Sequence, residues 1–318
     1  MERLSLTDSR KAELESRWQA VCEPLPGRIP YLNRRPCRIR AAEDGRRFID
    51  LLEARFPGKL SVTEWEKVFE QGQLVREDDQ VPVNDPYVRV TAGHRYQRLL
   101  LDWVEPDIAS DLQVVAEDET LLILDKPSPL PMHEGGRFFK NTLKWLMAQA
   151  WPEMNVRYTH RLDAETQGLL VCVKGNEARN EVQGQFARNE VGKVYHALVH
   201  GQPSWKGRLV ETPVPAEGRE WGKPLSAATE LRVLEQRLGG RALVEARPKT
   251  GRTHQIRVHL WQEGHAIVGD RRYLPEHQVG EKEIGVKGDE PLCLLSAKVT
   301  FRHPSTQEEL TFCSERSL

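Results

Sequence analysis

The chain has 318 residues, of which 39% are hydrophobic and 29% are charged. This composition is typical of a soluble globular protein and excludes a collagenous, low-complexity or disordered chain. Lysine and arginine number 46 against 47 acidic residues, so the formal charge of -1 gives no global positive field that would indicate nucleic acid. A local basic cleft is still compatible with this balance.

The five cysteines are odd in number and show no C-x-x-C spacing, which argues against a disulfide framework or a zinc knuckle. A reducing cytoplasm is therefore the expected location, and Cys172, inside the apolar run GLLVCVKG, is expected in the core. The N-terminal segment lacks the apolar stretch of a signal peptide, and no apolar run approaches the roughly 20 residues that cross a bilayer. We expect no membrane partner.

Residues 1–26 are predicted to form an amphipathic helical arm that ends at the prolines and glycine of CEPLPGRIP. The segment that follows is rich in arginine and contains only two acidic residues, Glu43 and Asp44. It is either a solvated linker or a strip that follows phosphates. We call it the arginine strip, and its members are Arg28, Arg34, Arg35, Arg38, Arg40, Arg46 and Arg47.

A small α/β module is predicted over residues 27–105. FIDLLEARFP has helical apolar spacing, and Thr63 precedes Glu66 by three residues, which predicts a capping box for a second helix ending at Gly72. An extended stretch with DD and ND turn signals follows. We treat this module as a candidate RNA-binding domain.

A linker is predicted at 105–111, and the sequence beyond it indicates a sheet domain over 106–318. LQVVAEDETLLILDKP reads as a hairpin, and helices are expected at NEARNEVQGQFARNE and from near Thr253. Strands that adjoin strands, with helices between only some of them, predict an α+β fold with a mixed, largely antiparallel sheet flanked by helices and loops. The further predicted strands are GLLVCVKG, KVYHALVHG, ATELRVLEQ, GRALVEARP and LCLLSAKVTF.

Two polar clusters are candidate sites. YTHRLDAETQG (158–168) directly precedes an apolar strand, where a loop commonly displays catalytic groups, although an ordinary ion-paired turn is the alternative. In the second cluster, over 249–270, Thr253 is predicted to cap a helix whose N-terminus favours an anion and which ends before Gly264. A helix packed in the core with solvated charges is the alternative there.

Several chemistries are disfavoured by the motifs. His196 and His200 have a spacing that suits a metal, but as residues of one strand they lack an obvious third ligand. Neither a P-loop nor a G-x-G-x-x-G fingerprint occurs, and no G-x-S-x-G elbow is present. We therefore expect no metal, nucleotide or redox cofactor.

HRLDAETQG resembles the signature H-R-L-D-x-x-T-S-G of the RluA-type pseudouridine synthases. Further segments follow in the family's order: LILDKPSPLPMH before it, then K-x-Y at residues 193–195, GRTHQIRVHL and GHAIVGDRRY. The resemblance extends from near Leu112 to the C-terminus. Gln167 stands where the family commonly has Ser, and the connection before SAATE is longer or differently spaced than usual.

Members of this family convert uridine in RNA to pseudouridine, so the resemblance implies an isomerase that acts on rRNA or tRNA without a cofactor. It implies that Asp163 is the essential carboxylate and that Arg257 pairs with it in fork geometry. It also implies that Tyr195 stacks on the uracil near the proton that leaves carbon 5. The resemblance also implies residues at the substrate. Ile256 would form part of the pocket wall, and His160 and Arg161 would contact the RNA backbone or maintain the shape of the loop.

Two other functions remain as alternatives. The first is a non-catalytic RNA-binding or ribosome-assembly protein on the same scaffold. The second is a glycosidase that uses Asp163 with Glu165, although residues two apart in an extended loop point in different directions. The sequence does not determine the oligomeric state, and a monomer is favoured.

Overall fold

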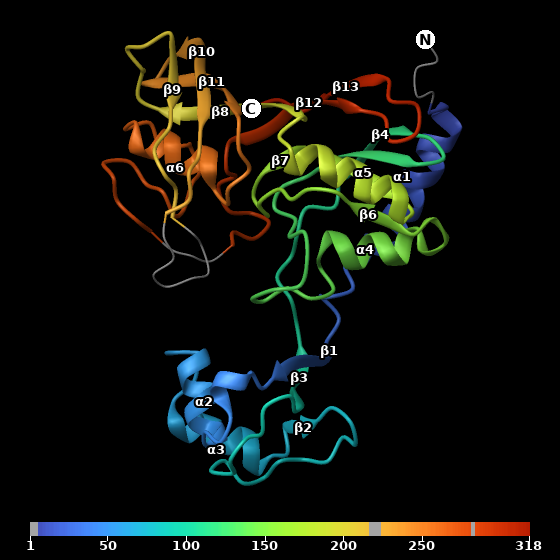
Figure 1. Cartoon of the computed structure of the whole chain (residues 1–318), viewed down its shortest axis with the longest axis vertical. Coiled ribbons are helices and arrows are strands. Elements are labelled where there is room, and N and C mark those ends of the chain that lie inside the picture. Colours follow the sequence, from blue (N-terminus) through green and yellow to red (C-terminus); the bar gives the residue numbers. More distant parts are fainter. Residues whose placement is uncertain (1–5, 216–223, 281–283) are drawn as a thin grey trace. The chain divides into compact units, whose positions relative to one another are not determined.

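The computed structural model describes residues 6–215, 224–280 and 284–318, and it divides into two compact units (Figure 1). The larger unit contains the chain up to Arg28 together with Glu105–Leu318, and the smaller unit is Ile29–Val104. The helix α1 (Asp8–Cys22), expected as an arm, therefore belongs to the larger unit, where it packs against α4 (Leu143–Ala150). The connection before SAATE includes residues 216–223, which lie outside the described ranges. None of the described helices is long and apolar enough to cross a bilayer.

The smaller unit is a three-stranded antiparallel sheet covered by two helices. Its strand order is β1-β3-β2, and its core contains the fully buried aromatic side chains of Phe48, Trp65 and Phe69. The predicted helix at FIDLLEARFP is present as α2. The elements are β1 (Tyr31–Arg38), the 3-10 turn η1 (Ala41–Glu43), α2 (Phe48–Arg55), α3 (Val62–Glu70), β2 (Leu74–Arg76) and β3 (Arg95–Trp103).

In this unit one local expectation was wrong, and one of two open alternatives is excluded. The capping box of α3 lies two residues earlier than predicted, because Ser61 has the same S/T-x-x-E spacing: its backbone N–H donates to the Glu64 carboxylate, and its hydroxyl accepts from the Glu64 N–H. The stretch 31–38 of the arginine strip is not a linker, because it pairs along its length with β3.

The larger unit is built on one mixed sheet with the order β4-β5-β7-β12-β8-β11-β10-β9, to which β6 and β13 add at β7 and β12. Among the described strands, every pairing is antiparallel except that of β7 with β12. The predicted α+β fold and the five single strands named above are confirmed. The strands are β4 (Gln113–Glu117), β5 (Leu121–Lys126), β6 (Val156–Tyr158), β7 (Gln167–Lys174), β8 (Gly192–His200), β9 (Gly207–Val210), β10 (Thr229–Arg237), β11 (Arg241–Pro248), β12 (Leu294–Arg302) and β13 (Glu309–Cys313).

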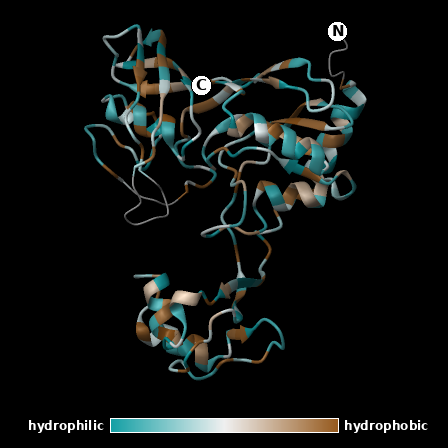
Figure 2. Cartoon of the chain, in the orientation of Figure 1, coloured by the Kyte–Doolittle hydropathy of each residue, from teal (hydrophilic) through white to brown (hydrophobic). Residues whose placement is uncertain are grey.

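The central strand β7 is buried on both faces, and Cys172 lies in the core as predicted. Leu170 and Cys172 join the cluster that contains α1 and α4, whereas Val171 joins the cluster formed with α5 (Asn176–Ala187). Figure 2 shows hydrophobic residues concentrated on the strands of this sheet. The remaining helices are the short η2 (Pro152–Met154) and α6 (Gln255–Gln262), which packs against β10 and β11.

The parallel contact between β7 and β12 requires a glycine at position 168. Gly168 has a φ of 107° and lies opposite Ser296, and a Cβ at this position would collide with the backbone N and O of Ser296. The last residue of the HRLDAETQG motif is therefore needed for backbone approach.

The segment 105–111, predicted as a linker, is instead packed into the larger unit. Glu105 is 3% exposed, and its carboxylate accepts hydrogen bonds of 2.8 Å from the backbone N–H groups of Phe139, Lys140 and Asn141. Successive N–H groups that converge on one carboxylate form an anion-binding nest. This contact fixes the chain where it enters the larger unit.

We predict that Glu105→Gln lowers the free energy of unfolding by about 1–3 kcal/mol, because an amide NH2 group would face N–H donors and the charge-assisted bonds would be lost. Urea unfolding of the full chain measures this change. The exposed Glu119 is the matched control, and Glu119→Gln should stay within about 0.5 kcal/mol of wild type. Equal midpoints for the two variants would show that the nest contributes nothing.

Candidate active site

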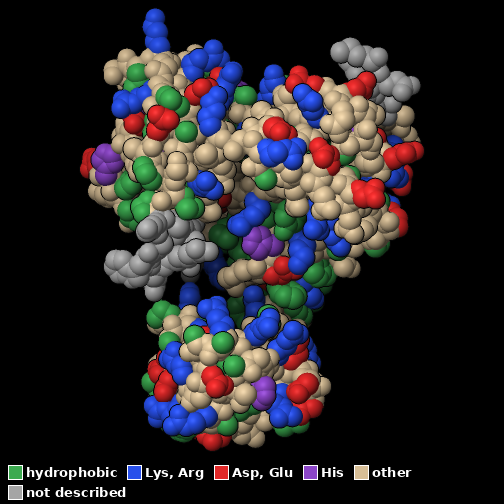
Figure 3. All heavy atoms as spheres, in the orientation of Figure 1, with side chains coloured by type: hydrophobic (Ala, Val, Ile, Leu, Met, Phe, Trp, Pro, Cys, Tyr) green, Lys and Arg blue, Asp and Glu red, His purple; other side chains and the backbone are tan. Residues whose placement is uncertain are grey.

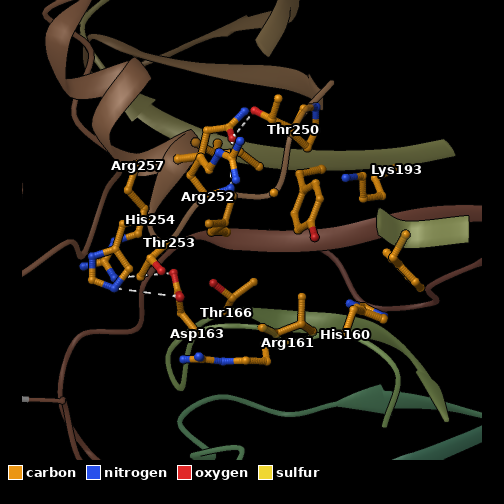
Figure 4. Close-up of a pocket in the computed structure, with 18 of the residues that line it drawn as sticks. His160, Arg161, Asp163, Thr166, Lys193, Thr250, Arg252, Thr253, His254 and Arg257 are labelled. Carbon is orange, nitrogen blue, oxygen red and sulfur yellow. Dashed lines mark hydrogen bonds and ion pairs between the residues drawn. The ribbon is translucent and has the colours of Figure 1, made fainter. Parts of the chain in front are cut away.

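A pocket of about 630 Å³ brings together the two polar clusters singled out in the sequence (Figure 4). One wall is the loop 158–166 that leads into β7, and the other is the connection 248–257 from β11 into α6. Between them lie Lys193 and Tyr195 of β8. The sheet order explains this convergence, because β12 joins β7 on one side and β8 on the other, and β11 follows β8.

Asp163 lies in this pocket with a side chain that is 26% exposed. Its Oδ2 is 3.7 Å from Nη1 of Arg257, and its Oδ1 is 3.8 Å from Nε2 of His254. These distances are longer than hydrogen bonds, so the carboxylate is in an electrostatic contact with the guanidinium and keeps its lone pairs available.

The fork geometry expected between Arg257 and Asp163 is found with Asp270 instead. The Nε and Nη2 atoms of Arg257 donate hydrogen bonds of 2.8 Å each to the two oxygens of Asp270. Burial alone would lower the pKa of Arg257, but the hydrogen bonds to Asp270 raise it above its ordinary value. Arg257 is thus a permanently charged, 3% exposed group whose remaining nitrogen faces Asp163.

Tyr195 is a buried residue of β8 that lines the pocket and lies opposite Ser296 of β12. Burial raises the pKa of Tyr195 to about 12, so its phenol is protonated at neutral pH. The ring can stack on a base, and the phenol can donate a hydrogen bond. Ile256, 7% exposed, also lines the pocket and at the same time belongs to the main core cluster.

His160 and Arg161 differ in their environments. The ring of His160 stacks on Phe186 with centroids 4.4 Å apart, and its Nε2 accepts a hydrogen bond of 3.0 Å from the N–H of Val171. Burial, with Lys193 nearby, lowers the pKa of His160 to about 3, so the imidazole is neutral. Arg161 is exposed at the pocket.

Two residues with evident roles were missed in the sequence. Asp270 belongs to the quoted segment GHAIVGDRRY, and besides holding Arg257 it accepts from the backbone N–H groups of Arg272 and Tyr273. Lys126 belongs to the quoted segment LILDKP. The available signals were the position of Asp270 after Gly269 and that of Lys126 before Pro127. Neither signal indicates which distant residue would be the partner.

Lys126 is fully buried beneath the loop of Asp163. Its Nζ donates to the carbonyl oxygens of Pro127, Leu130 and Ala164 at 2.9–3.1 Å, so one of its bonds reaches the residue after Asp163. Three acceptors match the three N–H bonds of an ammonium group, although burial lowers the pKa of Lys126 to about 7. This lysine therefore links the end of β5 to the loop that carries Asp163.

The start of α6 differs from the prediction. The N-cap is His254 in the left-handed conformation, with φ 54° and ψ 17°, and Thr253 does not cap the helix. The side-chain oxygen of Gln255 accepts from the Arg252 N–H and the Thr250 hydroxyl, which orders the turn in place of a threonine cap. At the other end, Gly264 has a φ of 81°, as predicted.

Within the described ranges, no group of three or more His, Cys, Asp and Glu side chains is arranged to hold a metal ion. His196 and His200 lie on β8 outside the pocket lining.

Comparisons with known proteins identify the family to which the chain belongs. A family model described as RNA pseudouridylate synthase matches residues 120–262. An uncharacterised RNA pseudouridine synthase of Synechocystis sp. is 30% identical over 256 residues, which cover 77% of this chain and 86% of that protein. The chain belongs to the RNA pseudouridylate synthase family. The family predicted from HRLDAETQG is thereby confirmed.

Other relatives match a smaller share of their own length. Ribosomal large subunit pseudouridine synthase C of Vibrio cholerae is 34% identical over 208 residues, covering 62% of this chain and 63% of the relative, so the match spans less than two thirds of that protein. Among solved structures, human RNA pseudouridylate synthase domain containing 1 has a TM-score of 0.53 at 24% identity. The match covers 67% of this chain and 86% of the human chain, and at this identity it shows a similar fold.

We predict that His160 makes stability depend on pH. Between pH 6.5 and about 3 the unfolded chain binds a proton at this residue and the folded chain does not, so stability is lost as pH falls through this window. The free energy of unfolding should therefore fall less steeply with decreasing pH in His160→Gln, by up to about 1.4 kcal/mol per pH unit.

Urea unfolding at pH 6.5 and 4.5 measures the slope, and His277→Gln, which removes an exposed imidazole, is the control with an expected wild-type slope. A His160→Gln slope equal to that of wild type would mean that the folded protein protonates His160 as readily as the unfolded chain does.

Proposed function

We propose that this protein is an RNA pseudouridine synthase that isomerises specific uridines, with Asp163 as the essential carboxylate. The observation that carries the proposal is the placement of Asp163 in the pocket, 3.7 Å from the buried Arg257. Tyr195 lines the same pocket. A carboxylate, a fixed cation and an aromatic ring around one cavity suit a reaction on an extruded base.

The reaction breaks the bond between N1 of uracil and C1′ of ribose and forms a bond between C5 and C1′. C5 then loses its proton, and N1 gains one, so the product is an isomer and the atoms balance without a co-reactant. Asp163 either adds to carbon 6 of the uracil or assists at C1′; both roles need an ionised carboxylate, which a nearby guanidinium favours. The protonated Tyr195 would stack on the base and provide a polar group near C5.

Ribosomal RNA is the favoured substrate class over tRNA, because relatives such as the Vibrio cholerae protein carry the name of a large-subunit pseudouridine synthase. Arg161 and Arg252 are exposed at the pocket, where they would contact RNA phosphates, while His160 would hold the loop in shape. Figure 3 shows Lys and Arg side chains interspersed with acidic ones, so attraction to RNA would come from local groups.

Asp163→Asn should abolish turnover and leave RNA affinity within a few fold, because the shape is kept and only the charge is lost. The assay is release of tritium from a large-subunit rRNA transcript that carries uridine tritiated at C5. The surface variant Glu119→Asn is the control for handling and should retain wild-type release. Turnover by Asp163→Asn would refute the essential carboxylate, and a silent wild type that still binds RNA would favour the non-catalytic alternative.

The smaller unit is proposed to bind RNA through the members of the arginine strip that it contains, which are all except Arg28. Arg34, Arg38 and Arg40 are exposed, whereas the guanidinium of Arg35 lies 5.5 Å from the ring centroid of Trp103 and Arg47 pairs with Asp50. Arg34, Arg38 and Arg40 are the exposed members that we propose meet phosphates, and Arg34 also donates to the side-chain oxygens of Gln80 and Gln97.

We predict that changing Arg34, Arg38 and Arg40 together to Ser weakens RNA binding and flattens its salt dependence, by about 0.7 units of log-log slope for each lost contact to single-stranded RNA. Turnover at saturating RNA should survive. Arg76→Ser, which removes an arginine already paired with Asp79, is the control. An unchanged affinity and slope in the triple variant would assign RNA binding to the larger unit alone.

A further inference from the structure

The residue before α6, His254, has a backbone conformation that is costly for a residue with a side chain. Its φ of 54° lies in the left-handed region, where non-glycine residues are uncommon and histidine and asparagine are enriched. Such strain persists only where the surrounding structure over-determines the conformation, which is common at functional sites. Here it directs the imidazole, which is 16% exposed, toward Asp163 (Figure 4).

Tyr273 orients this imidazole. Its hydroxyl is 3.1 Å from Nδ1 of His254, and the two rings meet edge to face with centroids 5.6 Å apart. If the phenol donates to Nδ1, the proton of the neutral imidazole is on Nε2, the atom that faces Asp163. A phenol that donates to Nδ1 would thus select the tautomer that points an N–H group at the carboxylate.

Asp270 connects both groups that face Asp163. It holds the guanidinium of Arg257 directly, and its Oδ1 accepts from the backbone N–H of Tyr273 at 3.0 Å. The guanidinium carbon of Arg257 is also 5.3 Å from the Tyr273 ring centroid. One buried carboxylate thus contacts Arg257 directly and holds the backbone of Tyr273, whose hydroxyl lies against His254.

The two oxygens of Asp163 are bracketed symmetrically: Oδ2 faces Arg257 at 3.7 Å and Oδ1 faces His254 at 3.8 Å. We propose that His254, oriented by the Tyr273 hydroxyl, is a positioning residue that holds Asp163 in its reactive orientation together with Arg257. This inference rests on the proposed function, because it names a further residue that the same reaction needs.

The test compares His254→Asn and His254→Gln. Asn tolerates the left-handed backbone but is too short to reach Asp163, whereas Gln places an amide N–H near the former Nε2. At saturating enzyme, His254→Asn should lower the single-turnover rate on the tritiated rRNA transcript about tenfold or more, with RNA affinity changed less than about twofold. His254→Gln should recover part of that loss.

A double-mutant cycle tests the link to Tyr273. Tyr273→Phe keeps the ring against Arg257 and removes the hydroxyl, so it should slow single turnover several fold in the wild-type background and add nothing to His254→Asn. Independent, multiplicative losses would overturn the tautomer link. A His254→Asn variant with a wild-type rate, or with a loss confined to RNA affinity, would overturn the positioning role.

A spectrum separates this inference from the proposed function. In protein labelled with ¹⁵N-histidine, the His254 signals, assigned by their loss in His254→Asn, should show the Nε2–H tautomer and should shift in Asp163→Asn. No shift in Asp163→Asn would overturn the contact whether or not the protein turns over RNA. Expected shifts with a silent wild type would refute the proposed function and leave the contact standing.

Discussion

The buried ion pair between Arg257 and Asp270 is the interaction on which the rest of the site depends. Arg257 comes from α6 and Asp270 from the segment after it, and both are almost completely buried. Removing either partner of such a pair leaves an uncompensated charge at a cost of about 3–5 kcal/mol. Because the fork occupies Nε and Nη2 of Arg257, Nη1 is left to face Asp163, and the pocket receives a positive charge whose position does not rely on substrate.

This arrangement separates the cations that build the site from those that would meet RNA. The buried Arg257 faces Asp163 and Glu165, and the buried Lys126 holds the same loop through a carbonyl oxygen; burial raises the pKa of Glu165. Arg161 and Arg252, by contrast, are exposed at the pocket. The near-zero net charge of the chain is therefore compatible with a strongly charged site, because some charged residues are buried around Asp163 and others are exposed at the pocket.

The strands were predictable because β-branched and alternating apolar residues report local burial, and the α+β class followed from their order along the chain. The local sequence pattern could not predict contacts between residues that are far apart in the sequence. Asp270 and Lys126 lay within quoted segments, yet their roles depend on groups brought near by the sheet order. The two helix caps were mispredicted for local reasons. Ser61 has the same spacing to an acidic residue as Thr63, and the Gln255 side chain orders the turn before α6 in place of a threonine cap. Asp163, Arg257 and Tyr195 were singled out by the family resemblance, since ion-paired turns would have shown the same residue types.

The order of strands in the sheet has a consequence for biogenesis. β12 is near the C-terminal end of the sequence but lies between β7 and β8, which leave the ribosome far earlier. Until Leu294–Arg302 has inserted, the loop that carries Asp163 and the strand that carries Tyr195 have no shared neighbour, and Gly168 has no backbone to approach. Such long-range pairing forms slowly because the loop-closure entropy is spent before the contacts are gained. The pocket is therefore completed only late in synthesis, after β12 has joined β7 and β8.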